Sequence, residues 1–273
     1  MNCAIESHSQ ADATPLGAEA LGYLELGGDW TCGEAPLARE TALAISYNGI
    51  SQAVMMVSPG DIEDFVRGFS LSNAIVSGLD EIYDIRLGPA GDAQHAAVEI
   101  SSRAFWALKR QRRQLAGSSG CGLCGVAALE QALPELTPLQ PAPLPAAQHL
   151  EGLRQRIEQA QRAARDSGAL HAALYFDGQG RTCLCREDIG RHNALDKLIG
   201  AMAQAGIDAS EGFVALTSRC GLELIHKAVR ARIGTLVSLS APTALTVQWA
   251  RRNRLNLIHL PHRSRPRLYS PAP

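Results

Sequence analysis

No stretch of the sequence is apolar over the roughly 18 residues that a membrane-spanning helix needs, so we expect no membrane association. Residues 1–7 contain no basic segment followed by an apolar one, so we expect no secretory leader and a cytoplasmic location. The chain also has little net charge, because 26 Lys and Arg residues oppose 27 Asp and Glu residues. It therefore lacks the overall field that draws proteins to nucleic acid, and we expect no nucleic-acid partner.

The sequence also lacks the even number of cysteines that a set of disulfides would use. There are seven cysteines, and without a leader this number indicates free thiols in a reducing compartment. Cys121 and Cys124 lie three positions apart in a segment, 117–125, that is rich in Gly and Ser. This composition favours a loop that presents its thiols. Such a pair is typical of metal binding, redox chemistry or sulfur chemistry, and the spacing alone does not choose among them. Three other cysteines are expected to pack or to be incidental: Cys3, Cys32 and Cys220.

Five prolines fall between residues 134 and 145, which predicts a semi-extended linker over 134–146. A chain of 273 residues can hold two modest domains on either side of it. The N-terminal domain is predicted over 36–133 and ends in the cysteine loop, and the second is predicted over 147–273. Residues 1–35 show no clear periodicity, and we expect a loosely ordered lead-in there. The cysteine loop then lies near the seam between the domains, where ligand sites are common.

The N-terminal domain is predicted to mix strands and helices. Asn48-Gly49 is a strong hairpin signal between the first two strands. The last helix carries four basic residues directly before the cysteine loop, and positive charge of this kind lowers a thiol pKa. These residues are Lys109, Arg110, Arg112 and Arg113. The predicted strands are 42–47, 52–57, 81–87 and 95–100, and the predicted helices are 62–76 and 102–115.

The second domain alternates helices with short apolar strands, which predicts an α/β layered domain with a largely parallel or mixed sheet. In such sheets, ligands bind at the carboxyl ends of the strands. The predicted helices are 147–166, 191–204, 221–232 and 242–253. The predicted strands are 169–176, 181–186, 213–217, 235–239 and 255–260.

Polar and basic residues follow three of these strands, at 186–197, 217–223 and 240–243. Turns and helix caps account for part of this pattern, but three such ends favour a shared groove for a phosphorylated ligand. The tail at 259–267, with three Arg and two His, could close over a nucleotide. The candidate cofactor-binding residues are Arg186, Asp188, Gly190, Arg191, His192, Asn193, Asp196, Lys197, Ser218, Arg219, Ser240, Thr243, Leu260, Pro261, His262, Arg263, Ser264 and Arg265.

Two other kinds of site remain open. Cys183 and Cys185 point to one face of a predicted strand and could complete a Cys₄ zinc site with the cysteine loop. About 60 residues separate the two pairs, far from compact zinc-ribbon spacing, so we favour a site without metal. A hydrolytic deaminase is disfavoured because His171 lacks the Glu of a His-x-Glu signature and follows the cysteine pair in the chain.

The motifs occur in a recognisable order. They are Asn48-Gly49, Met55-Met56, Pro59-Gly60-Asp61, Gly68-Phe69, Cys121-x-x-Cys124-Gly125, His171-Ala172-Ala173, the run at 186–197, Glu223, Lys227-Ala228 and Ser240-Ala241-Pro242-Thr243. The set resembles the FdhD/NarQ family of formate dehydrogenase accessory sulfurtransferases from about residue 40 to the end. The most specific part is Glu-Asp-Ile-Gly-Arg-His-Asn-Ala-Leu-Asp-Lys at 187–197.

The resemblance implies both a fold and an activity. The fold is a C-terminal cytidine-deaminase-like three-layer α/β domain with a smaller N-terminal α+β domain. The activity is that of a homodimeric sulfur carrier, which takes persulfide sulfur from a cysteine desulfurase. The recipient is the molybdenum bis(guanine dinucleotide) cofactor, bound as a substrate and destined for formate dehydrogenase, and no permanent cofactor is implied. Cys121 would carry the persulfide and Cys124 would assist.

This sequence departs from the family pattern in places. The Thr-Glu-Gly expected after Gly68-Phe69 is Ser72-Asn73-Ala74 here. Further changes fall at 217–221 and 259–265, within the proposed nucleotide groove. Two alternatives follow. One is a divergent relative that serves another molybdoenzyme, and the other is a zinc-stabilised nucleotide-binding scaffold without sulfur chemistry.

Overall fold

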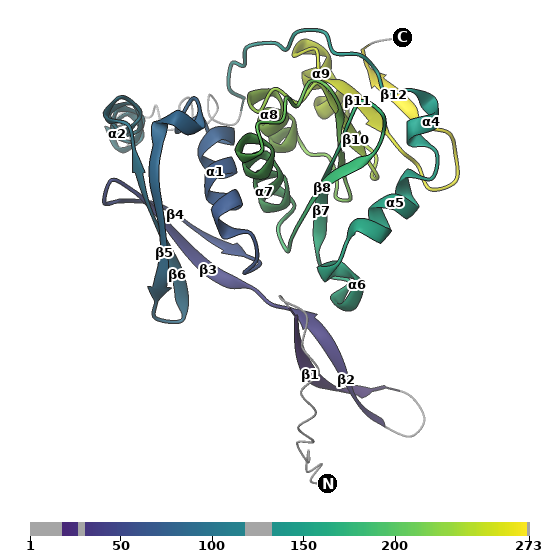
Figure 1. The fold of residues 1–273 in the computed structure, drawn as a ribbon, viewed down its shortest axis with the longest axis horizontal. Coiled ribbons are helices and arrows are strands. Elements are labelled where there is room, and N and C mark those ends of the chain that lie inside the picture. The colour runs from purple at the N-terminus through teal and green to yellow at the C-terminus, as the bar shows by residue number, and fades with distance from the viewer. Residues whose placement is uncertain (1–17, 27–30, 118–132, 272–273) are drawn as a thin grey trace.

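The computed structural model describes residues 18–26, 31–117 and 133–271. Within these residues the strands form three sheets of two, four and six strands. The four-stranded and six-stranded sheets stand side by side with helices between them, and the two-stranded hairpin projects from one end of the body (Figure 1). No helix in the described ranges combines the length and the apolar character that crossing a membrane requires.

The projecting hairpin differs from the loosely ordered lead-in expected for residues 1–35. β1 (Ala18–Glu25) pairs antiparallel with β2 (Thr31–Ala38), in a register that runs from Ala18↔Ala38 to Glu25↔Thr31. Ala and Gly occupy much of both strands, and their weak hydrophobic contrast hid the alternation that marks a strand.

The four-stranded sheet has the order β4-β3-β6-β5 and is covered on its inner face by α1. Asn48 and Gly49 both have positive φ, 45° and 80°, so the predicted tight hairpin between β3 and β4 is confirmed. Helix α1 ends at Ser72, before the predicted end near residue 76, because Ala74 takes a left-handed φ of 53°. The elements of this half are β3 (Thr41–Tyr47), β4 (Ile50–Val57), α1 (Ile62–Ser72), the 3₁₀ turn η1 (Leu79–Glu81), β5 (Ile82–Ala90), β6 (Ala93–Ile100) and α2 (Ser102–Gly117).

The six-stranded sheet has the order β12-β11-β10-β9-β7-β8. Strands β9, β10 and β11 are parallel, whereas β7 and β12 run against their neighbours, so the sheet is mixed as predicted. The single helix expected over 147–166 is broken into three, first at Gly152, which has φ 62°. The elements are α4 (Ala147–Leu150), α5 (Leu153–Ala160), α6 (Ala163–Ser167), β7 (His171–Phe176), β8 (Thr182–Asp188), α7 (Arg191–Gln204), β9 (Phe213–Leu216), α8 (Leu222–Arg230), β10 (Thr235–Ser238), α9 (Ala244–Arg252), β11 (Asn256–His259) and β12 (Arg267–Ser270).

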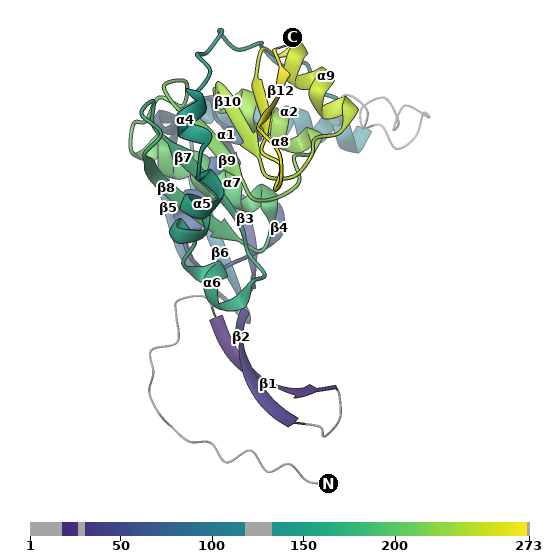
Figure 2. The ribbon, with the colours of Figure 1, turned by 90° about the vertical axis from the view of Figure 1, so that its right-hand side faces the viewer.

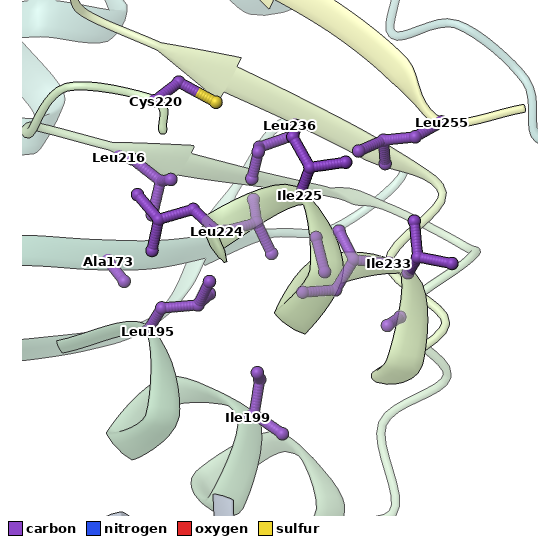
Figure 3. Packing of buried hydrophobic residues seen from close by; sticks show 14 of the residues in the cluster. Ala173, Leu195, Ile199, Leu216, Cys220, Leu224, Ile225, Ile233, Leu236 and Leu255 are labelled. Atoms are coloured by element: carbon purple, nitrogen blue, oxygen red, sulfur yellow. The ribbon is translucent and has the colours of Figure 1, made fainter. Parts of the chain in front are cut away.

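Helices cover both faces of the six-stranded sheet, which gives this half three layers. Alternate strand residues face opposite sides. Leu216 and Leu236 pack with side chains of α7, α8 and α9, including Leu195, Leu224 and Ile225 (Figure 3). On the other face, neighbouring strand residues pack against α4 and α5. This second core comprises Leu150, Leu153, Ile157, Ala172, Leu174, Phe176, Phe213, Ala215, Val237, Ile258 and Leu260.

The two halves of the chain are joined by direct contact between α1 and α7. A Cβ added to Gly68 would lie 1.7 Å from the carbonyl oxygen of Asp196, and one added to Gly200 would lie 1.9 Å from that of Asp64. Glycine is therefore required at both positions, because no side-chain carbon fits between the backbones. The seam between the predicted domains is thus a packed helix pair, and the domain boundaries themselves stay a prediction.

Replacing Gly68 by Ala is expected to push α1 and α7 apart and to lower the free energy of unfolding by about 3 kcal/mol, because the new methyl group meets backbone rather than a movable side chain. Urea denaturation followed by circular dichroism measures the change. Gly88→Ala is the matched control, since a Cβ there meets no atom within 4 Å. An equal loss in both variants, or none in Gly68→Ala, would contradict the packing described.

Candidate functional site

The segments predicted to bind a ligand meet at one edge of the six-stranded sheet. Strands β9, β10 and β11 are parallel, and β8 shares their direction because β7 pairs antiparallel with both β8 and β9. The carboxyl ends of these four strands therefore lie at the same edge, together with the amino end of α7. We call this the carboxyl edge. The prediction that the polar clusters fall at strand ends on one side of a sheet is confirmed.

Several of the predicted residues are accessible at the carboxyl edge. Arg219 is exposed and Arg191 is half-buried at the start of α7. Past β11, the side chains of His262, Arg263, Ser264 and Arg265 are all exposed. The edge thus carries an excess of cationic side chains, which suits an anionic ligand such as a phosphate group.

The hydroxyl residues of the edge serve the local structure. Ser218 is buried, and Thr243 caps α9 by accepting a hydrogen bond from the Thr246 backbone N–H at 3.2 Å. Ser240 is half-buried, and its backbone carbonyl accepts from the Ser238 hydroxyl at 2.8 Å. Leu260 is buried and Pro261 is partly so.

Asp188 and Lys197 form an ion pair at 2.8 Å with no exposed side-chain surface on either residue. The Asp188 carboxylate also accepts from the backbone N–H groups of Ser58 and Gly190, at 2.9 and 2.8 Å. Lys197 donates to the Ser58 carbonyl at 3.0 Å. Asn193 donates to Asp188 at 2.9 Å and to the Met56 carbonyl at 2.8 Å. These side chains therefore bind the β4–α1 connection to the second half, rather than facing solvent.

Asp196 belongs to a second buried cluster. Its carboxylate accepts hydrogen bonds from Ser72 at 2.6 Å and from Lys227 at 2.8 and 2.9 Å. Burial raises the pKa of Asp196, and the Lys227 ammonium acts in the opposite direction. The cluster joins α1, α7 and α8, and Arg230 adds a hydrogen bond to the Ser72 carbonyl at 3.0 Å.

Arg186 and Gly190 also have internal roles. The Arg186 guanidinium pairs with Asp64 at 2.7 Å and lies 3.7 Å from Asp61, so it links β8 to the start of α1. Gly190 precedes α7, and a Cβ there would lie 2.6 Å from the Asn193 amide nitrogen. The absence of a side chain lets Asn193 fold back toward Asp188.

Two histidines lie beside the cationic residues of the edge. His192 Nε2 is 2.6 Å from a Glu223 carboxylate oxygen. Burial, followed by the charge of Arg191, lowers the pKa of His192. Burial, Arg191 and Arg219 likewise lower the pKa of His171. Each imidazole places ring nitrogens that can donate or accept a hydrogen bond beside the cationic residues of this edge.

Sequence reasoning missed the groups that hold this edge in place. Ser58 and Ser72 are not recognisable from the sequence, because a hydroxyl residue near the end of a helix is normally interpreted as a helix cap. Arg154 is not recognisable from the sequence either. From α5 its guanidinium donates hydrogen bonds to the carbonyls of Leu239 and Leu260, at 3.1 and 2.5 Å. These contacts fix the carboxyl ends of β10 and β11.

Cys121 and Cys124 lie outside the described residues, as do the side chains of Arg112 and Arg113.

The chain after this segment is described from residue 133, and residues 135–137 line a cavity of 270 Å³ with Arg230 and Arg232. A larger cavity of 380 Å³ adjoins it at the seam between the halves. Both lie at the end of α8 that leads into β10, which is the opposite edge of the sheet from the carboxyl edge. Residues of the larger cavity include Leu71, Ala74, Ile199, Met202, Arg230 and Arg232.

The other cysteines are described in part. Cys220 is buried in the core, as expected, and burial raises its pKa to about 12. Cys183 is exposed on β8, and burial raises the pKa of Cys185 to about 12. Within the described ranges no three His, Cys, Asp or Glu side chains gather as a metal site would require. A Cys₄ site stays untested, because its other pair falls in 118–132. On α2, the Lys109 ammonium lies 4.4 Å from the centroid of the Phe105 ring.

The fold and the site define a mixed α/β protein that has a cationic surface at the carboxyl edge of its larger sheet. Buried ion pairs lie next to this surface and fix its position. The chain belongs to the FdhD/NarQ family, which it matches over residues 38–273. The family resemblance inferred from the motifs is therefore confirmed.

Relatives with curated names are similar over most of their length. The sulfur carrier protein FdhD of Bordetella petrii is 42% identical over 236 residues, which cover 86% of this chain and 84% of that protein. The protein of the same name from Xanthomonas euvesicatoria pv. vesicatoria is 44% identical over 226 residues, or 81% and 79% of the two chains. Among solved structures, a putative formate dehydrogenase accessory protein from Desulfotalea psychrophila superposes with a TM-score of 0.70 at 20% identity, covering 92% of this chain and 96% of that one. This likeness shows a shared fold.

Replacing Lys197 by Met is expected to lower the free energy of unfolding by about 3–5 kcal/mol, because the buried Asp188 carboxylate loses its counter-charge. Chemical denaturation measures the loss. Arg86→Met, which breaks an exposed ion pair with Asp84, should cost less than about 1 kcal/mol. Similar small losses in both variants would show that the buried pair does not hold the two halves together.

Proposed function

We propose that this protein is a sulfur carrier that serves formate dehydrogenase, and that it acts as a sulfurtransferase. The observation that carries the proposal is the similarity to proteins named sulfur carrier protein FdhD, at about 40% identity over most of both chains. The Cys121-x-x-Cys124 motif supplies the thiol chemistry that such a role needs.

The chemistry begins with a persulfide on a cysteine desulfurase. The Cys121 thiolate attacks the outer sulfur of this persulfide. A new S–S bond forms on Cys121, the original S–S bond breaks, and its electron pair leaves with the desulfurase cysteine as a thiolate. Cys124 assists by receiving the sulfur, or by displacing it as Cys121 and Cys124 form a disulfide.

The proposed recipient is the molybdenum bis(guanine dinucleotide) cofactor, held as a substrate. Its phosphates suit the cationic carboxyl edge, where Arg191, Arg219, Arg263 and Arg265 are accessible. The imidazoles of His171 and His192 would offer hydrogen bonds to the same ligand. The buried residues Asp188, Asn193, Asp196 and Lys197 would act indirectly, by setting the position of this edge.

We further propose that the six-stranded half is a cytidine-deaminase-like domain. A mixed sheet with helices on both faces supports this assignment. The protein would act as a cytoplasmic homodimer, with a cysteine desulfurase as donor and formate dehydrogenase as client. A zinc-stabilised scaffold is the alternative, and a divergent relative serving another molybdoenzyme is a narrower variant of the first proposal.

Incubation with a cysteine desulfurase and free cysteine should add about 32 Da, the mass of one sulfur atom, to the peptide containing residues 121–124. Mass spectrometry of the non-reduced digest detects the adduct. Cys121→Ala should abolish it and should also fail to restore formate dehydrogenase activity in a host that lacks its own family member.

Cys183→Ala is the control, because it removes an exposed thiol outside the proposed site. It should retain both the adduct and the activity. Full activity of Cys121→Ala would contradict the carrier role. Stoichiometric zinc lost on substitution of either Cys121 or Cys183 would instead favour the scaffold.

Guanosine diphosphate, used as a probe for the dinucleotide, is expected to bind the carboxyl edge. Arg219→Glu should raise its dissociation constant at least about tenfold, because a cation that contacts phosphate becomes an anion. Isothermal titration calorimetry of the full chain measures the change. Arg110→Glu is an equal change of charge at an exposed position of α2 and should leave binding within about twofold of the original. Equal weakening by both would indicate a long-range charge effect rather than a site.

A further inference from the structure

The β1–β2 hairpin projects from the body with almost all of its surface exposed. Both views show it standing clear of the two larger sheets (Figures 1 and 2). At its root, Ala18 is buried near α6, the element of the body that the hairpin contacts most. Only Arg39 and Glu40 separate β2 from β3, so the hairpin is held away from the body by a short connection.

One face of the hairpin gathers three of its large apolar side chains. The antiparallel register places Leu21 beside Ala35 and Tyr23 beside Gly33, and the next pair on the same face toward the root is Glu19 beside Leu37. The Tyr23 ring lies across Gly33, where a Cβ would come within 2.7 Å of it. Leu21, Tyr23 and Leu37 are 49%, 44% and 45% exposed. A two-stranded hairpin is marginally stable alone in water, so we expect the apolar side chains on this face to pack against another surface.

The charge of the hairpin indicates which kind of surface packs against it. Its described residues, 18–26 and 31–38, include three glutamates, Glu19, Glu25 and Glu34, and neither lysine nor arginine. The complementary surface lies on the same chain, where the carboxyl edge and the turn after β11 present exposed Arg219 and the segment 262–267. The hairpin of one copy therefore matches the cationic edge of another copy in sign.

The position of the hairpin allows that contact to be reciprocal. The Glu187 carboxylate at the end of β8 accepts hydrogen bonds from the first backbone N–H groups of α6, at 2.8–2.9 Å. Because α6 in turn contacts β2, the root of the hairpin stands at the carboxyl edge. A two-fold axis beside this edge would bring each hairpin onto the edge of the other copy, as an isologous interface requires.

We infer that the β1–β2 hairpin is an arm that docks on a second copy of this chain, with the face formed by Leu21, Tyr23 and Leu37 against the partner's carboxyl edge. The inference deepens the homodimer proposed above by naming its surface. It places a hairpin of the partner at the rim of the cationic site, so each site is complete only in the dimer.

Sedimentation velocity of the full-length chain over a range of concentrations tests the arm. The protein is expected to be dimeric, and the double substitution Leu21→Lys/Leu37→Lys should raise the dimer dissociation constant at least about tenfold, because it removes two apolar contacts and sets two cations against the partner's cationic edge. Raising the salt concentration from about 0.05 to 0.5 M should also weaken the wild-type dimer, since unlike charges meet across the contact.

Leu24→Lys is the matched control, because Leu24 is 51% exposed on the opposite face of the hairpin. It should leave the dissociation constant within about threefold of wild type. A monomeric wild-type protein would overturn both the dimer and the arm. An unchanged dimer in the double variant would overturn the arm alone, and equal dissociation by Leu24→Lys would overturn the assigned face. Sulfur transfer to Cys121, measured by mass, is a separate readout that none of these outcomes decides.

Discussion

The fully buried ion pair between Asp188 and Lys197 is the interaction on which the rest of the structure depends. Removing two charges from water costs several kcal/mol for each, so the pair persists only because other hydrogen bonds complete it. Those bonds come from Ser58, Gly190 and Asn193, which belong to both halves of the chain. A pair placed in this way specifies how the halves fit together, because any shift of the β4–α1 connection would leave a buried charge without its partners.

This internal role changes the meaning of the most specific motif in the sequence. The run at 187–197 contains residues of two kinds, which differ in burial. Asp188 and Lys197 turn inward and position the carboxyl edge, whereas Arg191 remains accessible at the first turn of α7. A cationic surface of this sort binds an anion well only if its donors are held in place before the ligand arrives. If the proposed ligand binds here, the buried residues contribute by fixing the geometry of the residues that would touch it.

The sequence predicts most of the fold but little of the burial. The helix expected at 191–204 has those bounds, and Asn48-Gly49 forms the expected turn, because both depend on local patterns. The β1–β2 hairpin was missed since Ala and Gly conceal its alternation. Helix α1 ends where Ala74 adopts a positive φ, and an alanine in the sequence does not predict that conformation. The polar clusters lie at the strand ends where the sequence places them, yet buried and accessible polar residues look alike in sequence, so the internal roles of Asp188 and Lys197 could not be assigned.

The contact between α1 and α7 limits how such a protein can deliver a ligand or a sulfur atom. Phe65 and Val66 pack α1 into the core of the four-stranded sheet, while Gly68 and Ser72 meet α7. Helix α1 is therefore held on both sides. Opening the seam would separate backbones in direct contact and expose the Asp196 carboxylate and its hydrogen-bonded partners, at a cost of several kcal/mol. Closure of one half on the other is thus a poor mechanism for the proposed transfer, and any movement that the proposed sulfur delivery needs must come from segments outside this packed seam.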